Sequence, residues 1–107
     1  VEAFLAVDAS LVKSKDSFIL RVKGDSMIEA HIVEGDMAII QPQTTAENRD
    51  IVVAIIDGEA TLKRFYREPG HIRLQPENAA LEPILMRPGE DIQIIGKVTG
   101  LFRPVGK

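Results

Sequence analysis

Short runs of alternating or β-branched apolar residues recur along this chain and predict a series of β-strands. Gly and Pro turn residues separate these runs at close spacing, and almost no stretch shows the period of an amphipathic helix. The pattern predicts an all-β, barrel-like fold in which residues 1–107 form a single domain. Residues 1–16 lack a sustained period and are interpreted as an edge segment and loop. Strands are expected at residues 17–23, 37–41, 50–56, 59–67, 71–75 and 91–103.

The dipeptide Asp57-Gly58 lies between two of these runs and gives the strongest local signal in the chain. Asp-Gly between strands favours a two-residue type I′ hairpin, because both central positions require positive φ. Such a turn fixes the register of the return strand, so Thr61, Lys63 and Phe65 are expected to point to the same side. Lys63 therefore shares a strand face with a threonine and an aromatic ring.

The final predicted strand, residues 91–103, is apolar on both faces. A terminal strand of this kind is a candidate for pairing with a second copy of the chain, which predicts a homodimer through the C-terminal strand. An ordinary core strand would show the same pattern. One face is expected to carry Ile92, Ile94, Val98 and Phe102, with Gly96 and Gly100 between them, and the other Ile95 and Leu101.

A sharp corner is predicted where the first strand ends, at Gly24-Asp25-Ser26-Met27. Gly24 tolerates backbone angles that other residues resist, so a short helical turn can begin at Ser26 and present its hydroxyl on the corner. This position suits a nucleophile. The run from Ser26 to Glu29 equally fits a capping box, in which Ser26 only closes the first turn and Glu29 reaches back.

A serine nucleophile needs a base, and the chain offers few. Either His31 or His71 could complete a triad, but the two histidines do not suggest a metal site. The other choice is a lysine, whose pKa burial among apolar neighbours can lower from ~10.4 toward neutrality. Lys63 is the lysine best placed for burial, since it lies inside a strand next to Leu62. The alternative interpretation is that Lys63 points into solvent.

Composition narrows the possible partners. The balance of 13 basic and 16 acidic side chains gives a net charge of -3, which offers no footprint for nucleic acid or anionic lipid. Cysteine is absent, so disulfides and thiolate zinc sites are excluded and a reducing compartment such as the cytoplasm is expected. No apolar run approaches transmembrane length and no signal peptide is evident, so no membrane association is predicted.

The motifs together resemble the C-terminal peptidase domain of LexA repressors. The superfamily of these repressors also includes UmuD-like proteins, phage repressors and, more distantly, type I signal peptidases. The resemblance covers nearly the whole chain and is specific, because the serine block, the lysine block and their spacing recur together. In close relatives a glycine is expected where Arg49 stands. The matching segments are Arg21-Val22-Lys23-Gly24-Asp25-Ser26-Met27, Gly35-Asp36, Asp50-Ile51-Val52-Val53-Ala54, Thr61-Leu62-Lys63-Arg64, Pro76-Glu77-Asn78, Glu82-Pro83-Ile84 and Gly96-Lys97-Val98.

The resemblance implies a self-cleaving serine endopeptidase that uses no metal and no cofactor. Ser26 would be the nucleophile and Lys63 its neutral base, with the backbone amides of Asp25 and Ser26 stabilising the oxyanion. In this family a RecA filament on single-stranded DNA promotes cleavage of an Ala-Gly bond in an upstream loop. Cleavage separates a DNA-binding helix-turn-helix domain from the dimerising peptidase domain and relieves repression of DNA-damage genes, the SOS response.

The chain departs from a full-length family member in two ways. It contains no Ala-Gly dipeptide and no helix-turn-helix region, so DNA would be bound only through the missing N-terminal domain. The expectation is a cleavage product or a truncated form that begins at Val1. Two other functions stay open: a UmuD-like processed polymerase subunit, and a non-catalytic β-barrel dimerisation module in which Ser26 only caps a turn.

Overall fold

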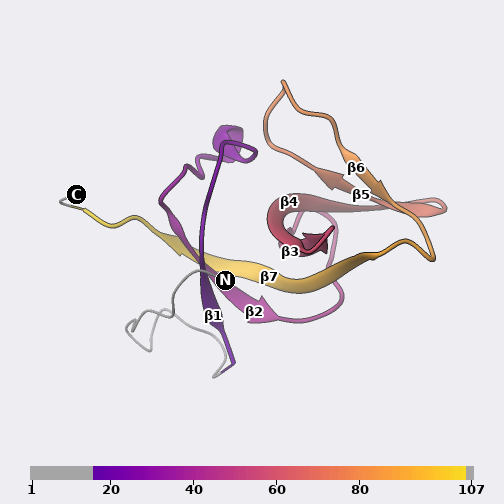
Figure 1. The fold of residues 1–107 in the computed structure, drawn as a ribbon, viewed down its shortest axis with the longest axis horizontal. Coiled ribbons are helices and arrows are strands. Elements are labelled where there is room, and N and C mark those ends of the chain that lie inside the picture. The colour runs from indigo at the N-terminus through magenta and orange to yellow at the C-terminus, as the bar shows by residue number, and fades with distance from the viewer. Residues whose placement is uncertain (1–15, 106–107) are drawn as a thin grey trace.

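The computed structural model describes residues 16–105, which fold into one antiparallel sheet of seven strands (Figure 1). The predicted edge segment therefore lies, except for Asp16, outside the described residues. The strand order in the sheet is β1-β2-β7-β3-β4-β5-β6. Along the chain, the elements are β1 (Phe18–Arg21), the 3-10 turn η2 (Ile28–Ala30), β2 (Met37–Pro42), β3 (Ile51–Ile56), β4 (Glu59–Glu68), β5 (His71–Gln75), β6 (Ile84–Met86) and β7 (Ile92–Phe102).

The sheet curls into an open half-barrel, as expected for an all-β, barrel-like fold. The last strand, β7, lies in its centre and pairs with β2 on one side and β3 on the other. In Figure 1, β7 crosses the molecule, with β1, β2 and η2 toward one end and β5 and β6 toward the other. Across residues 16–105, the chain has no helix with the length and apolar character needed to span a bilayer.

Two apolar clusters stabilise the sheet. Because neighbouring strand residues point to opposite faces, Val53 packs in the first cluster and Val52 in the second. The first cluster lies under the serine corner and includes Leu20, Val22 and Met27, with Phe18 packed against it. The second cluster includes Phe65 and Leu74, which are almost fully buried.

The predicted hairpin is confirmed. Asp57 and Gly58 have φ values of 52° and 80°, and Ile56 pairs with Glu59 across the two-residue turn. The strand predictions are also confirmed to within a few residues, except that β6 was missed. This edge strand has only three residues, between Pro83 and Pro88, and its pairing with β5 defines it more than its composition does.

The predicted faces of the final strand are wrong beyond Ile94, because Ile95 and Val98 pack against the same apolar cluster. The pairing of β7 shifts register at two β-bulges. One lies between Ile94 and Gly96, which pair with Ala54 and Val53 of β3. The other lies between Val98 and Gly100, which pair with Ile40 and Ile39 of β2. A bulge inserts one extra residue and reverses the alternation beyond it. Ile94 consequently packs in the second apolar cluster, whereas Val98 packs against the first.

Gly96 lies where β7 closely approaches β2, which leads to a stability prediction. A Cβ atom at this position would contact Ile40 Cγ2 and lie 2.9 Å from the backbone oxygen of Gln41. Gly96→Ala is therefore expected to lower the free energy of unfolding by about 1 to 2 kcal/mol, since backbone must move to make room. Urea unfolding measures this loss.

Gly100→Ala is the matched control, because its Cβ would lie 3.2 Å from Ile39 Cδ1, the flexible end of a side chain. The control should lose less stability than Gly96→Ala. Equal stability of the two variants would contradict the close approach at Gly96.

Candidate active site

The serine corner begins where β1 ends. The backbone N–H of Val22 donates to Asp36 O (2.8 Å) and that of Gly35 donates to Val22 O (2.9 Å), which ties the strand to the loop before β2. Gly24 then takes φ 77°, a left-handed conformation that glycine adopts without steric cost, and its N–H donates to Glu34 Oε1 (2.9 Å). These contacts direct the chain into the turn that carries Ser26.

The capping box at this corner is not formed. The N-cap of η2 is Met27, and no side-chain hydrogen bond caps the turn. The Glu29 carboxylate instead accepts the backbone N–H of Ala79 (2.8 Å). The capping interpretation was therefore wrong, and the Ser26 hydroxyl is available for another contact. A tight 3-10 turn that begins one residue later explains the difference.

That contact is with Lys63, which lies 37 residues further along the chain on β4. The Lys63 Nζ atom donates to Ser26 Oγ at 3.4 Å, to Thr61 Oγ1 at 2.5 Å and to Leu62 O at 3.2 Å. All three acceptors are uncharged. A neutral amine can satisfy the same site, because it has two N–H groups for Thr61 and Leu62 and a lone pair that can accept the serine proton.

Lys63 is buried, with only 7% of its surface exposed. Burial lowers the pKa of the Lys63 amine, because removing a cation from water disfavours the charged form. Val52 is its direct partner across β3 and β4 and is fully buried. The amine thus faces a pocket of about 570 Å³ formed by the end of β1, the serine corner and the start of β4.

Two backbone amides at the corner are candidates for anion binding. Among residues 16–105, no group accepts a hydrogen bond from the Asp25 N–H or from the Ser26 N–H. Both residues line the pocket into which the Lys63 amine faces. Unused N–H groups at the entrance of a helical turn can bind an oxyanion.

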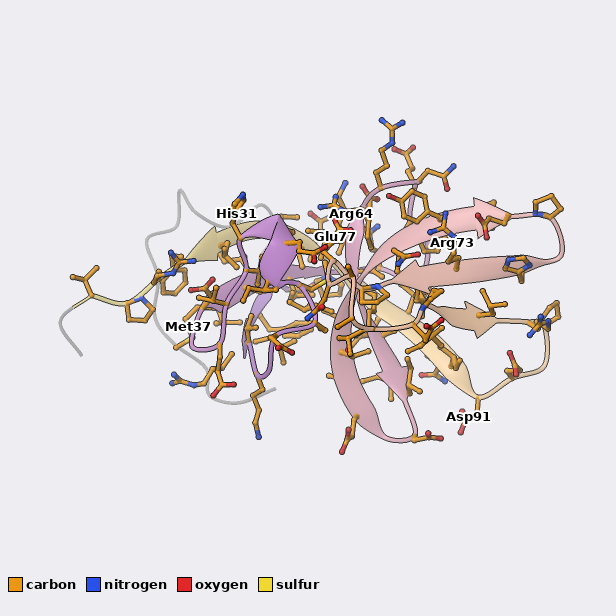
Figure 2. All side chains as sticks on the ribbon, turned by 90° about the horizontal axis from the view of Figure 1, so that it is seen from above. His31, Met37, Arg64, Arg73, Glu77 and Asp91 are labelled. Atoms are coloured by element: carbon orange, nitrogen blue, oxygen red, sulfur yellow. The ribbon has the colours of Figure 1, made fainter. Side chains whose placement is uncertain are left out.

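The loop after β5, residues 76–80, packs against the serine corner. The Asn78 side-chain amide donates to Asp25 O (2.9 Å), and the Glu29 N–H donates to Glu77 O (2.8 Å). Arg64 on β4 forms an ion pair with Glu77 at 3.2 Å, and Figure 2 shows the two side chains next to each other near the middle of the molecule. The sequence indicated this loop only as a strand break and a family motif, so the contact of Asn78 with Asp25 was missed.

Arg49, where relatives are expected to have glycine, adopts φ 78°. Glycine is favoured at such an angle because it lacks a Cβ atom, which gives the expectation a physical reason. The Arg49 N–H donates to Phe65 O (2.7 Å), and its carbonyl accepts from Arg64 Nη1 (2.7 Å).

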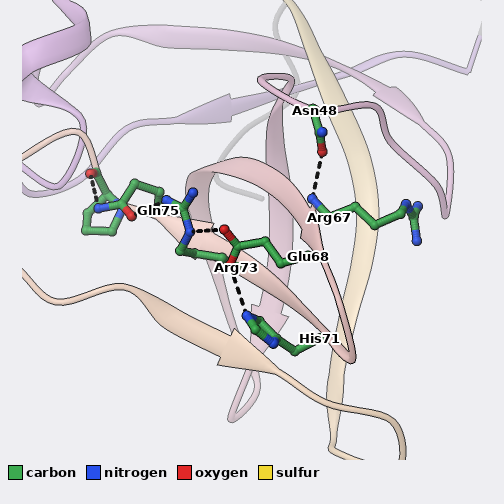
Figure 3. Close-up of polar contacts among 7 residues, drawn as sticks. Asn48, Arg67, Glu68, His71, Arg73 and Gln75 are labelled. Carbon is green, nitrogen blue, oxygen red and sulfur yellow. Dashed lines mark hydrogen bonds and ion pairs between the residues drawn. The ribbon is translucent and has the colours of Figure 1, made fainter.

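Neither histidine forms a hydrogen bond with Ser26. His31 is the left-handed C-cap of η2, and His71 lies on β5. Figure 3 shows Glu68 between two partners: it accepts from Arg73 Nε (3.0 Å) and contacts His71 Nε2 at 2.9 Å. Within the described part of the chain, no group of three or more His, Asp or Glu residues could hold a metal ion.

Comparison with known proteins identifies the protein family to which the chain belongs. The sequence matches the Peptidase S24-like family over residues 1–99, and the chain belongs to this family.

Similar proteins of known name include several LexA repressors. The chain is 63% identical over 106 residues to LexA repressor 1 of Geobacter sulfurreducens, covering 98% of this chain and 52% of that protein. It is 60% identical to the LexA repressor of Citrifermentans bemidjiense, covering 96% of this chain and 52% of that protein. It is 54% identical to the LexA repressor of Caldicellulosiruptor saccharolyticus, with coverage of 96% and 50%. The chain thus spans about half the length of the curated relatives it matches.

Proposed function

We propose that this chain is the C-terminal, self-cleaving peptidase domain of a LexA-type SOS repressor, with Ser26 as nucleophile and Lys63 as general base. The observation that carries the proposal is the 3.4 Å separation of Ser26 Oγ and Lys63 Nζ, with the amine buried and surrounded by uncharged partners. The family match and the repressor relatives support the same function.

The reaction follows from these groups. Neutral Lys63 takes the hydroxyl proton as Ser26 Oγ attacks the carbonyl carbon of the scissile peptide bond. The negative charge on the carbonyl oxygen is stabilised by the Asp25 and Ser26 amides. The Lys63 ammonium then gives its proton to the leaving amine, and the C–N bond breaks. A water molecule, deprotonated by Lys63, hydrolyses the acyl-serine ester and restores both side chains.

The substrate and the control of the reaction are proposed from the resemblance to LexA repressors. The bond cut is an Ala-Gly bond in a loop upstream of this domain, and a RecA filament promotes the conformation in which that loop enters the pocket. DNA is bound only by a separate N-terminal domain. The protein acts in the cytoplasm. Cleavage then separates the two domains and ends repression.

Dimerisation is proposed to use the C-terminal strand. Leu101 on β7 is 39% exposed and Val105 beyond it is 94% exposed, although both are large apolar side chains. Among the described strands, β7 beyond Lys97 pairs with β2 on one side only, so the other edge of residues 98–102 is open for pairing with a second copy. The homodimer would then keep two peptidase domains together after cleavage.

The pH dependence of cutting tests the proposed function. A peptide that contains the Ala-Gly bond of a LexA-type cleavage loop, supplied in excess, should be cut at a rate that rises with pH as Lys63 deprotonates. Mass spectrometry of the products measures the rate. The midpoint should lie below the ordinary lysine pKa, because burial lowers the pKa of Lys63.

Ser26→Ala is the control and should leave no cutting above background, since Lys63 then has no hydroxyl to activate. Cutting that persists in Ser26→Ala, or a rate independent of pH, would count against the serine-lysine mechanism. A chain that never cuts but dimerises would favour the interaction module instead.

A further inference from the structure

The side chain of Asn78 has a defined orientation. Its Oδ1 atom accepts the backbone N–H of Ala80 at 2.9 Å, so its amide nitrogen faces the other way. That nitrogen donates to the carbonyl oxygen of Asp25 at 2.9 Å, across 53 residues of sequence. Both ends of the side-chain amide are thus used, one within its own loop and the other on the serine corner.

The carbonyl that Asn78 binds belongs to the peptide bond between Asp25 and Ser26. A trans peptide unit is planar, and its C=O and N–H groups point in opposite directions. A hydrogen bond that fixes the Asp25 oxygen therefore also fixes the direction of the Ser26 N–H, which points away from Asn78. The same hydrogen bond polarises the peptide and makes its N–H a stronger donor.

We propose that Asn78 is a positioning residue for the oxyanion site: by holding the Asp25 carbonyl, it aims the Ser26 amide at the carbonyl oxygen of the bond being cut. This inference rests on the proposed function, because it assumes that Ser26 attacks a peptide carbonyl. Asn78 does not itself contact the reacting atoms.

Three further contacts hold the loop of residues 76–80 against the serine corner and β4. The Ala79 N–H donates to Glu29 Oε2 and the Glu29 N–H donates to Glu77 O, both at 2.8 Å. Glu77 in turn pairs with Arg64, the residue after Lys63 on β4. Asn78 is therefore held in a loop that is tied both to the turn after Ser26 and to the strand that carries the amine. The Asp25 oxygen has a second, longer contact, from the Ile28 N–H at 3.3 Å.

The test is Asn78→Ser in the peptide-cutting assay. A serine hydroxyl can still accept the Ala80 N–H but is too short to reach Asp25 O, so the local turn is kept and the donor is lost. We expect kcat to fall at least ~10-fold, less than the ~10²-fold or more that follows removal of a direct oxyanion donor. KM and the pH midpoint should not change, since neither the pocket nor Lys63 is altered.

Glu29→Ala is the matched control. It removes the side-chain tie to Ala79 but leaves the Glu29 backbone contact with Glu77 and the Asn78 donor, so its kcat should fall much less. Thermal unfolding of both variants establishes that each is folded. The inference is overturned if Asn78→Ser retains kcat within ~3-fold, if Glu29→Ala loses as much, or if the loss comes from a moved pH midpoint.

A second readout needs no cutting. Loss of the hydrogen bond to the Asp25 carbonyl should shift the amide ¹⁵N resonance of Ser26 upfield in Asn78→Ser. An unmoved resonance would overturn the inference. If the unmodified chain never cuts the peptide, the proposed function fails, and the resonance still decides whether Asn78 controls the Ser26 amide.

Discussion

Lys63→Met should abolish peptide cutting while leaving the fold at least as stable as before. Without a base on the Ser26 hydroxyl, the rate is expected to fall on the order of 10³-fold. Methionine has a similar length but no charge to desolvate, and exchange of a buried charged group for an apolar one is often neutral or stabilising, so the free energy of unfolding should not fall at neutral pH. Peptide cutting and urea unfolding of the same samples measure the two effects.

The stability difference between the unmodified chain and the Lys63→Met variant should depend on pH in a definite direction, which separates burial of the amine from a packing effect. The folded pKa of Lys63 lies below the unfolded one, so the unfolded chain binds more protons between the two values. The unmodified chain should therefore gain stability relative to Lys63→Met as pH rises through that interval. Lys63→Arg, which stays charged, should also be inactive.

Cutting by Lys63→Met within about tenfold of the unmodified rate would exclude Lys63 as the base. A stability difference that does not vary with pH would mean that the amine is solvated in the folded chain.

Asp36→Asn is expected to destabilise the domain by about 2 to 3 kcal/mol at neutral pH. The Asp36 side chain is completely buried and accepts three hydrogen bonds, from Arg103 Nε (2.6 Å), Arg103 Nη2 (2.9 Å) and the Val33 N–H (2.9 Å). An asparagine amide would place N–H groups against one of these donors and leave a buried polar group unsatisfied. Urea unfolding at several pH values measures the loss.

The contribution of the Asp36 carboxylate to the free energy of unfolding should disappear at acid pH. The hydrogen bond from Arg103 holds the pKa of the Asp36 carboxyl below its ordinary value. Its contribution is therefore fully present above the unfolded pKa of about 4 and is lost as pH falls through the lower folded pKa. The unmodified chain and Asp36→Asn should converge in stability over that range.

Glu68→Gln is the control for Asp36→Asn. Glu68 also accepts from an arginine, but its side chain is 32% exposed, so water can replace the lost contact and stability should change little. Equal losses at the two positions, or a gap for Asp36→Asn that persists in acid, would contradict a buried and charged Asp36.

Much of the candidate site could be predicted from local signals. The Asp57-Gly58 turn fixed the register of β4, so Lys63 was expected beside Thr61, and its amine does donate to the Thr61 hydroxyl. The serine corner after the first strand was likewise expected from Gly24, which has positive φ. Hairpin turns and glycine corners depend on a few adjacent residues, which is why sequence patterns identify them.

Other features depended on contacts that sequence patterns do not encode. Ser26 and Glu29 fit a capping box, but Glu29 has a competing partner in Ala79, which is distant in sequence. Even alternation in the last strand failed, because two bulges interrupt the alternation of β7. The Asn78 contact was invisible for the same reason, since it joins segments 53 residues apart.

By itself, the sequence determined the all-β fold class, most strands and the hairpin register, because each depends on short-range periodicity or turn chemistry. The resemblance to LexA repressors then selected Ser26 and Lys63 as the candidate residues. Only the tertiary structure decided that the Ser26 hydroxyl and the Lys63 amine lie 3.4 Å apart and that Lys63 is buried. Burial and proximity arise from the curling of the sheet and the pairing of distant strands. The surroundings of the amine, which set its pKa, are therefore a property of the whole fold.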